Sequence, residues 1–200
     1  MTEAEIRRTK NLGRLSGELE AQGWHATELT IPMEEVGTKG LLFGIVMCLP
    51  FLVAWLVFHG LSAPQLWQVF AICAGYVVLI PVHEGVHGLT WALCNPQHFK
   101  AVEFGFMREY LTPYCTSVEP MDRTAYLAGS LMPLLVLGFA PAVVGIAFGN
   151  GVTFVLGLLM VLGASGDMLV AVQLVQHGKG AGEMLCVDHP SECGLVVFER

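Results

Sequence analysis

The chain has 200 residues, of which 54% are hydrophobic and only 14% are charged, and its mean hydropathy is +0.61. These values exclude an ordinary soluble globular domain, in which about 25% of residues are charged, and they predict an integral membrane protein. The formal net charge of −7 argues against nucleic acid as a partner, because nucleic-acid phosphates bind basic surfaces.

Residues 1–40 are predicted to form a segment outside the bilayer. Within it, Leu12, Leu15 and Leu19 recur at helical spacing, which predicts a short helix lying on the membrane surface or on the protein. Residues 24–31, WHATELTI, alternate weakly between polar and apolar types and predict a strand.

Four apolar runs are each long enough to cross a hydrocarbon core about 30 Å thick, which takes roughly 20 helical residues. They lie near Leu41–Phe58, Leu66–Leu93, Tyr126–Phe148 and Val152–Val175. The second run is longer than a bilayer requires, so we expect it to tilt or to leave the lipid at its C-terminal end. The sequence therefore predicts that residues 41–175 form an all-α membrane bundle of about four transmembrane helices.

Between the second and third runs lies a predicted cytoplasmic insert, residues 95–125. Val102, Phe104 and Phe106 are apolar at every second position, and a polar stretch separates them from Tyr114. This pattern predicts a β-hairpin at the face of the bundle.

The tail, residues 176–200, contains the strand-like stretch LCVDHPSECGLVVFE. Its strands could pair with the others into a small cytoplasmic sheet. We interpret Asp188 and His189 as turn residues before a strand, because Asp and Pro both favour turns.

All ten Lys and Arg residues lie in the N-terminal segment, the insert or the tail, and the two remaining loops carry none. The positive-inside rule makes the side with these charges cytoplasmic. We therefore expect a multi-pass protein with both termini in the cytoplasm.

The stretch PVHEGVHGLTWAL places two histidines and a glutamate inside the second apolar run. On a helix, His83 and His87 project from one face one turn apart, so both imidazoles can reach one ion. In HExxH sites the glutamate, here Glu84, takes a proton from water at a zinc ion. Ionisable groups are costly within a membrane, so the location favours a functional role over hydrogen bonding between helices.

Asp167 is the candidate third ligand, because it is the only acidic residue in the other three runs. Gly85 and Asp167 each lie eight residues from the expected cytoplasmic end of their run, so both halves of the site are level at about 12 Å depth. The alternative for Asp167 is a metal-free partner for a buried polar group. The rival ligands lie outside the runs, where solvated loop residues are expected, and are His98, Glu103, Glu119 and His177.

An HExxH in a span, a β-rich insert and an aspartate in a later span together resemble the site-2 protease group of intramembrane zinc metalloproteases. A closer resemblance is to the small bacterial membrane proteins grouped as putative zincin peptidases, in the stretches HEGVHGL, FGFMREYLTPYCTSVEPMDRTAYLAGSLMPL, SGD and DHPSECGLVVFE. This resemblance runs from about Trp24 to Glu199 and implies a location in a bacterial cell membrane.

Carried over by position, the resemblance implies that His83 and His87 are zinc ligands, Glu84 is the catalytic glutamate and Asp167 is the third ligand. One departure concerns the aspartate. Site-2 proteases usually place it in an Asn-Pro-rich segment ending Leu-Asp-Gly, whereas Asp167 is followed by methionine.

We therefore expect a zinc-dependent peptidase that hydrolyses a membrane protein or peptide near or within the membrane, with a metal-activated water and Glu84 as general base. Substrate is expected to bind at Val102, Phe104, Phe106 and Tyr114 by adding a strand to the hairpin.

Two other functions use the same residues. A membrane metal-binding or scaffold protein would hold zinc structurally, in a closed site of four ligands. A transporter would use the acidic and imidazole groups as an ion path, but the four runs lack an inverted repeat. Two imidazoles and a carboxylate also suit iron(II), although HExxH favours zinc.

Overall fold

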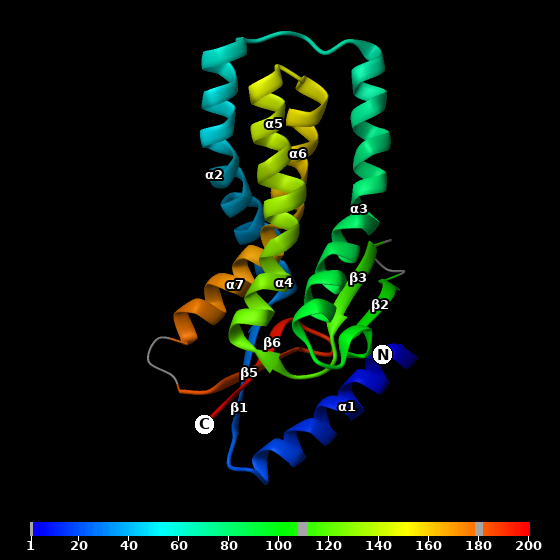
Figure 1. Cartoon of the computed structure of the whole chain (residues 1–200), viewed down its shortest axis with the longest axis vertical. Helices are drawn as coiled ribbons and strands as arrows, with labels where there is room; N and C mark the ends of the chain where they lie inside the picture. The colour runs from blue at the N-terminus through cyan, green and yellow to red at the C-terminus, as the bar shows by residue number, and fades with distance from the viewer. Residues whose placement is uncertain (1, 108–111, 179–181) are drawn as a thin grey trace.

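The computed structural model describes residues 2–107, 112–178 and 182–200 and is mostly helical. The helices of the apolar bundle are α2 (Met33–His59), α3 (Leu66–Cys94), α4 (Arg123–Pro133), the π-helical segment η2 (Leu134–Phe139), α5 (Ala140–Phe148), α6 (Gly151–Gly163) and α7 (Ser165–His177). Helix α1 (Glu3–Glu20) lies at one end of this bundle (Figure 1).

Three helical stretches are long and apolar enough to cross a membrane, namely α2, α3 and the continuous stretch from α4 to α5. Helices α6 and α7 pass the same test only as a pair and are bent by 48° where they meet. The predicted four apolar runs are therefore present, but the fourth is broken. The bend lies in a run of small residues around Ala164, whose backbone leaves helical geometry with φ −80° and ψ 8°.

Apolar side chains cover the outside of α2 and of the first half of α3. Val57 is 74% exposed and Phe70 is 67% exposed. Soluble proteins rarely expose large apolar surfaces, so this pattern is consistent with a membrane protein. The buried residues of α3 begin only at His83, so the C-terminal part of this long helix packs against protein.

The strands form two antiparallel sheets at the same end of the bundle as both termini (Figure 1). The four-stranded sheet has the order β1-β6-β5-β4, and β1 pairs with β6 from His25 opposite Glu199 to Ile31 opposite Cys193. The two-stranded sheet pairs β2 with β3. The strand bounds are β1 His25–Ile31, β2 Val102–Met107, β3 Thr112–Ser117, β4 Met121–Asp122, β5 Met184–Asp188 and β6 Cys193–Glu199.

The strands predicted from residues 24–31, from the insert and from the tail are thus present. Residues 108–111, between the two strands of the predicted hairpin, lie outside the described residues, as does Lys179 of the tail. Helix α1 packs on the four-stranded sheet rather than standing free, because Leu12 and Leu19 contact the cluster formed by Trp24, Val187, Val196 and Phe198.

Glycines let α5 and α6 approach closely. A Cβ on Gly157 would lie 2.5 Å from the backbone nitrogen of Ala142, and a Cβ on Gly145 would lie 2.5 Å from that of Phe154. Such small residues are how membrane helices come into contact without a hydrophobic driving force.

We expect Gly157→Ala to destabilise the protein by about 1–3 kcal/mol, because the added methyl group meets backbone that must shift. Thermal unfolding in detergent measures the effect. Gly163→Ala is the matched control, since a Cβ there meets nothing within 4 Å. Equal melting temperatures for the two variants would contradict the close packing of α5 and α6.

Candidate active site

The two histidines of the HExxH motif lie on the buried face of α3. His83 is 7% exposed and His87 is 4% exposed. Because they are one turn apart, their rings meet edge to face with centroids 4.8 Å apart, and their Nε2 atoms are 3.1 Å apart. The local helix geometry thus places two metal-ligating nitrogens side by side.

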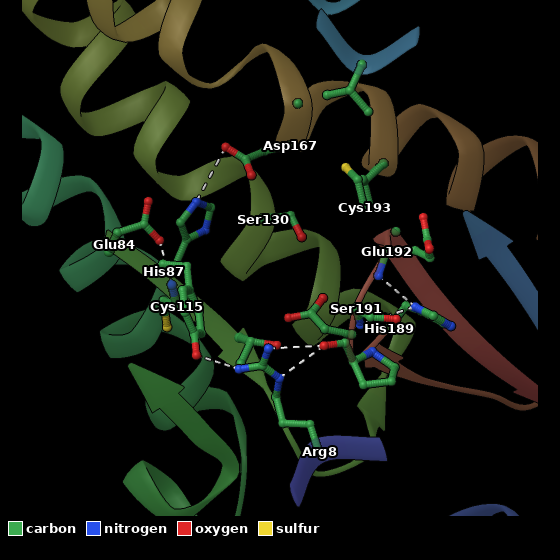
Figure 2. A pocket seen from close by; sticks show the side chains of 18 of the residues that line it. Arg8, Glu84, His87, Cys115, Ser130, Asp167, His189, Ser191, Glu192 and Cys193 are labelled. Carbon is green, nitrogen blue, oxygen red and sulfur yellow. Dashed lines mark hydrogen bonds and ion pairs between the residues drawn. The ribbon is translucent and has the colours of Figure 1, made fainter. Parts of the chain in front are cut away.

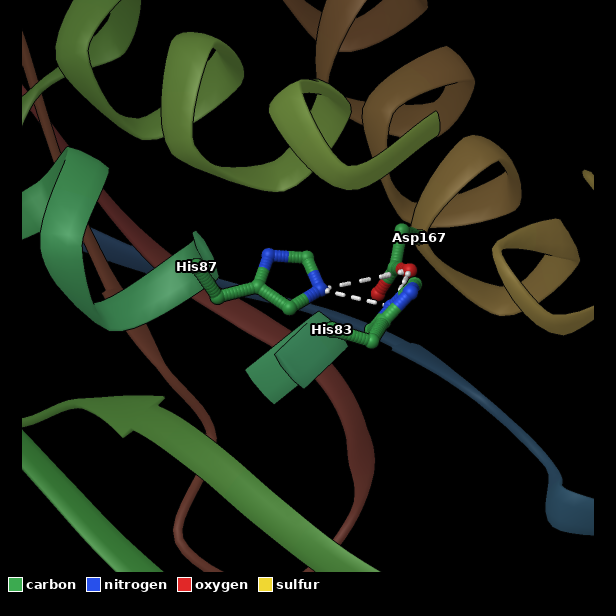
Figure 3. A group of neighbouring side chains, drawn as sticks. All are labelled: His83, His87 and Asp167. Atoms are coloured by element: carbon green, nitrogen blue, oxygen red, sulfur yellow. Dashed lines mark hydrogen bonds and ion pairs between the residues drawn. The ribbon is translucent and has the colours of Figure 1, made fainter. Parts of the chain in front are cut away.

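Asp167 brings a carboxylate to the same point from the first turn of α7 (Figure 3). Its Oδ2 lies 3.2 Å from Nε2 of His83 and 3.4 Å from Nε2 of His87. The bend before α7 turns this helix so that its first turn faces α3. One ligand atom from each of the three residues lies within 4.8 Å of the others, which makes the group a candidate metal site.

The backbone fixes the tautomer of His87. Its Nδ1 lies 2.9 Å from the carbonyl oxygen of Gly129 on α4 and must donate, since a carbonyl only accepts. The lone pair of Nε2 therefore points into the cluster, as metal-ligating histidines require. A glycine is needed at 129, because a Cβ there would lie 2.0 Å from Nε1 of Trp91, whose ring stacks on His87 with centroids 5.3 Å apart.

The donor set fits a divalent metal ion. Nε2 of His83 faces two acceptors, Nε2 of His87 and Oδ2 of Asp167, and a single N–H cannot point at both. One cation would satisfy all three atoms. The separations of 3.1, 3.2 and 3.4 Å also match the edge of about 3.3 Å in a tetrahedron whose ligands lie about 2.0–2.1 Å from zinc.

Nδ1 of His83 is buried and has no hydrogen-bond partner among the described residues. Ligating histidines usually donate this second N–H to a carboxylate, a carbonyl or water. The support that His87 obtains from Gly129 thus has no counterpart at His83 in the described protein atoms.

Glu84 follows His83 on α3, and its side chain lines the cavity described below. Its Oε2 accepts the backbone N–H of Cys115 on β3 at 2.7 Å. The hairpin packs directly on α3 at this level, because a Cβ on Gly88 would lie 2.2 Å from the ring of Phe104. The carboxylate of Glu84 is therefore oriented by a strand rather than by another side chain.

A cavity of about 460 Å³ opens beside these residues (Figure 2). Glu84, His87 and Asp167 line its inner wall, Tyr114 and Cys115 of β3 line one side, and the turn between β5 and β6 lines the other side. A cluster that is buried in protein but open to a cavity on one side has room for water and for a second molecule.

Helix α1 borders this cavity, and its Arg8 joins the two sides (Figure 2). The guanidinium donates from Nε and Nη2 to the carbonyl oxygen of Pro190 at 3.2 and 3.0 Å, and from Nη1 to the hydroxyl of Tyr114 at 2.5 Å. It also lies 4.9 Å from the centroid of the Tyr114 ring. No sequence pattern predicted this contact, because Arg8, Tyr114 and Pro190 are more than 70 positions apart in the chain.

Burial controls the acid–base state of the groups on the sheet side of the cavity. It raises the pKa of the Cys115 thiol far above its ordinary value and that of Cys193 to about 11, so both thiols stay protonated at neutral pH and are poor nucleophiles. Burial also raises the pKa of Asp188, and this shift is opposed by hydrogen bonds from Tyr126 and from the backbone of Ser117.

The predicted substrate-binding residues divide into two groups. Tyr114 lines the cavity. Val102 is 8% exposed and packs in the core against Trp91 and Ala92, while Phe104 and Phe106 are more than half exposed and do not line the cavity. Only one of the four apolar hairpin residues is therefore placed at the candidate site.

The rival metal ligands lie elsewhere. Glu103 pairs with Arg7 and Arg8, and the ring of His98 bonds the carbonyl of Ala92. Glu119 and His177 pair with Arg14 and with Glu199, respectively. Asp188, interpreted as a turn residue, instead ends β5, lines the cavity and accepts hydrogen bonds from the Ser117 amide and the Tyr126 hydroxyl.

A model of the family described as putative zincin peptidase matches residues 76–181, which is more than half of the chain. The matched region includes the HExxH motif, the hairpin and Asp167. No curated protein and no solved structure matches the chain.

Proposed function

Because the chain belongs to the putative zincin peptidase family, we propose that it is a zinc-dependent peptidase acting near or within a membrane, with Glu84 as its general base. The proposed metal ligands are His83, His87 and Asp167. The convergence of these three side chains beside Glu84, at the wall of a cavity, is the observation that carries the proposal. The proposed kinship with site-2 proteases is based on HExxH in one apolar helix and an aspartate in a later one.

Zinc at this site would polarise the scissile carbonyl and make water more acidic. Glu84 takes a proton from the attacking water and then gives it to the leaving amine. Before a peptide docks, the N–H of Cys115 holds one carboxylate oxygen of Glu84 beside the cluster. The carbonyl of Gly129 keeps the imidazole of His87 in the tautomer whose Nε2 can bind the metal.

The outer edge of β3 is the proposed docking surface for the peptide. In the pairing with β2, Phe104 lies opposite Cys115 and Val102 opposite Ser117. Since the amides of Cys115 and Ser117 donate to Glu84 and Asp188, they point away from β2, and so do the carbonyls of these residues. A peptide added along this edge would compete with Glu84 for the Cys115 amide, so docking would free the carboxylate.

Substitution of Cys115 with proline is expected to weaken peptide binding about three- to tenfold, because one backbone hydrogen bond is lost at about 0.5–1.5 kcal/mol. The affinity is measured in a Glu84→Gln background, which leaves the peptide intact, and Cys115→Ser is the control. Zinc should stay bound in both variants. Unchanged affinity in the proline variant would contradict docking at this edge.

The proposed enzyme is favoured over a structural zinc protein by the composition of the site. Structural zinc sites are usually closed by four protein ligands, whereas a catalytic site has three and an open position. Among the described residues, the cluster offers three, and the cavity adjoins it.

The proposal includes the location of the chain. Residues 41–175 form the membrane core of a bacterial cell-membrane protein, with residues 95–125 as a cytoplasmic insert, and residues 1–40 and 176–200 also face the cytoplasm. Its partners are the lipid bilayer and a membrane-protein or peptide substrate. Nucleic acid has no role.

Hydrolysis of quenched fluorescent peptides by the protein purified in detergent tests the function. We expect cleavage that a zinc chelator stops and that added zinc restores. Cleavage that survives the chelator would contradict a metallopeptidase.

A further inference from the structure

Asp188 is a half-buried carboxylate in the same cavity, and the proposed reaction does not use it. It is the last residue of β5. Its Oδ2 accepts the backbone N–H of Ser117 at 2.6 Å, and its Oδ1 accepts the hydroxyl of Tyr126. Removing a carboxylate even partly from water with only neutral donors is costly, so a neutral side chain would be expected if its only role were to join two strands.

The amide held by Asp188 belongs to the strand edge that meets Glu84. Ser117 and Cys115 are two residues apart on β3, so their N–H groups point from the same edge. Asp188 holds one of these groups and Glu84 holds the other, at 2.6 and 2.7 Å. Two carboxylates from different elements, β5 and α3, therefore fix successive amides of one edge.

Tyr126 connects Asp188 to the helices that carry the metal ligands. Its side chain is 2% exposed on α4, and its ring lies 5.7 Å from that of Trp91. Nε1 of Trp91 donates to the carbonyl of Tyr126 at 3.2 Å, and the Trp91 ring stacks on His87. Through Tyr126 and Trp91, Asp188 thus links the position of β3 to the side chains that position His87.

We propose that Asp188 is a positioning residue of the peptidase: it holds the edge of β3 beside Glu84, where the peptide would dock, and it ends this docking edge at Ser117. This inference rests on the proposed function. Asp188 acts through the strand and touches neither the metal ligands nor Glu84.

Removing only the Ser117 amide tests this role. Ser117→Pro lacks the N–H that Asp188 accepts, and proline is tolerated where an edge amide does not join the ladder. Ser117→Ala is the matched control, because it keeps the amide and loses only the hydroxyl, which donates to the carbonyl of Glu119. Asp188→Asn is the second variant, since its amide group cannot accept both donors. Asp122→Asn is its control, because Asp122 is an exposed carboxylate that accepts the backbone N–H groups of Thr124 and Ala125 away from the cavity.

We expect Ser117→Pro and Asp188→Asn to lower kcat about tenfold or more, since small misplacements of catalytic groups have large effects. Rates are divided by the amount of bound zinc, so that unfolded protein in a variant preparation does not lower the measured kcat. Zinc per chain should not change, and the two controls should stay within about twofold of wild type. Hydrogen exchange at the Cys115 amide gives a readout without turnover, and it should accelerate in Asp188→Asn but not in Asp122→Asn.

The outcomes separate this inference from the function. If wild type cleaves peptides but kcat in both variants stays within twofold of the controls, Asp188 is not a positioning residue and the function stands. Loss of zinc in the variants, or unchanged exchange at Cys115, would also overturn the inference. If wild type cleaves nothing, the proposed function fails first and the inference fails with it.

Discussion

Replacing Glu84 with glutamine is expected to abolish peptide hydrolysis and to leave zinc bound. Glutamine keeps an oxygen that can accept the Cys115 amide, so the local geometry is retained. It cannot take a proton from water, and general-base catalysis contributes about 10²–10⁴-fold to rates. The expected loss in kcat is therefore at least about a hundredfold.

Peptide cleavage and zinc content measured on the same preparation check this prediction. Glu119→Gln is the control, because Glu119 was a rival candidate from the sequence and pairs with Arg14 away from the cluster. Full activity in Glu84→Gln would show that another group acts as the base. Loss of zinc from this variant would instead identify Glu84 as a ligand.

Replacing His87 or Asp167 with alanine is expected to release zinc and to stop cleavage. Each residue provides one of the three atoms that meet within 4.8 Å. Even the loss of an outer hydrogen-bond partner lowers metal affinity about 10–100-fold, so the loss of a direct ligand should lower it further.

Elemental analysis after dialysis against a weak chelator measures this loss. His98→Ala is the control, because His98 bonds a backbone carbonyl outside the cluster. Zinc retained at the wild-type level in Asp167→Ala would remove Asp167 from the ligand set and return it to a role as a hydrogen-bond partner.

Local patterns in the sequence predicted the parts of the fold that depend on neighbours in the chain. The i, i+4 spacing of His83 and His87 fixes their common face on any helix. The period-two pattern after Val102 predicted β2, and the lone acid in the fourth apolar run predicted the approach of Asp167 to α3. The run itself was expected to be continuous, and its bend at Ala164 was not foreseen.

Other parts of the site depend on contacts between distant elements, which no local pattern encodes. The period-two pattern predicted that Val102, Phe104 and Phe106 belong to a strand of a hairpin, but not which strand edge faces Glu84. Only the pairing of β2 with β3 decides that the amides of β3 point to the cavity. The role of Gly129 beside His87 likewise follows from close contact between α3 and α4 and not from its own surroundings in sequence.

Elemental analysis of the wild-type protein, purified in mild detergent from metal-replete medium, tests the central claim most directly. A site made of two imidazoles and a carboxylate predicts about one zinc per chain. A protein that folds and remains in solution with no zinc, and takes up none when zinc is added, would contradict a zinc peptidase and leave His83, His87 and Asp167 as a polar contact between helices.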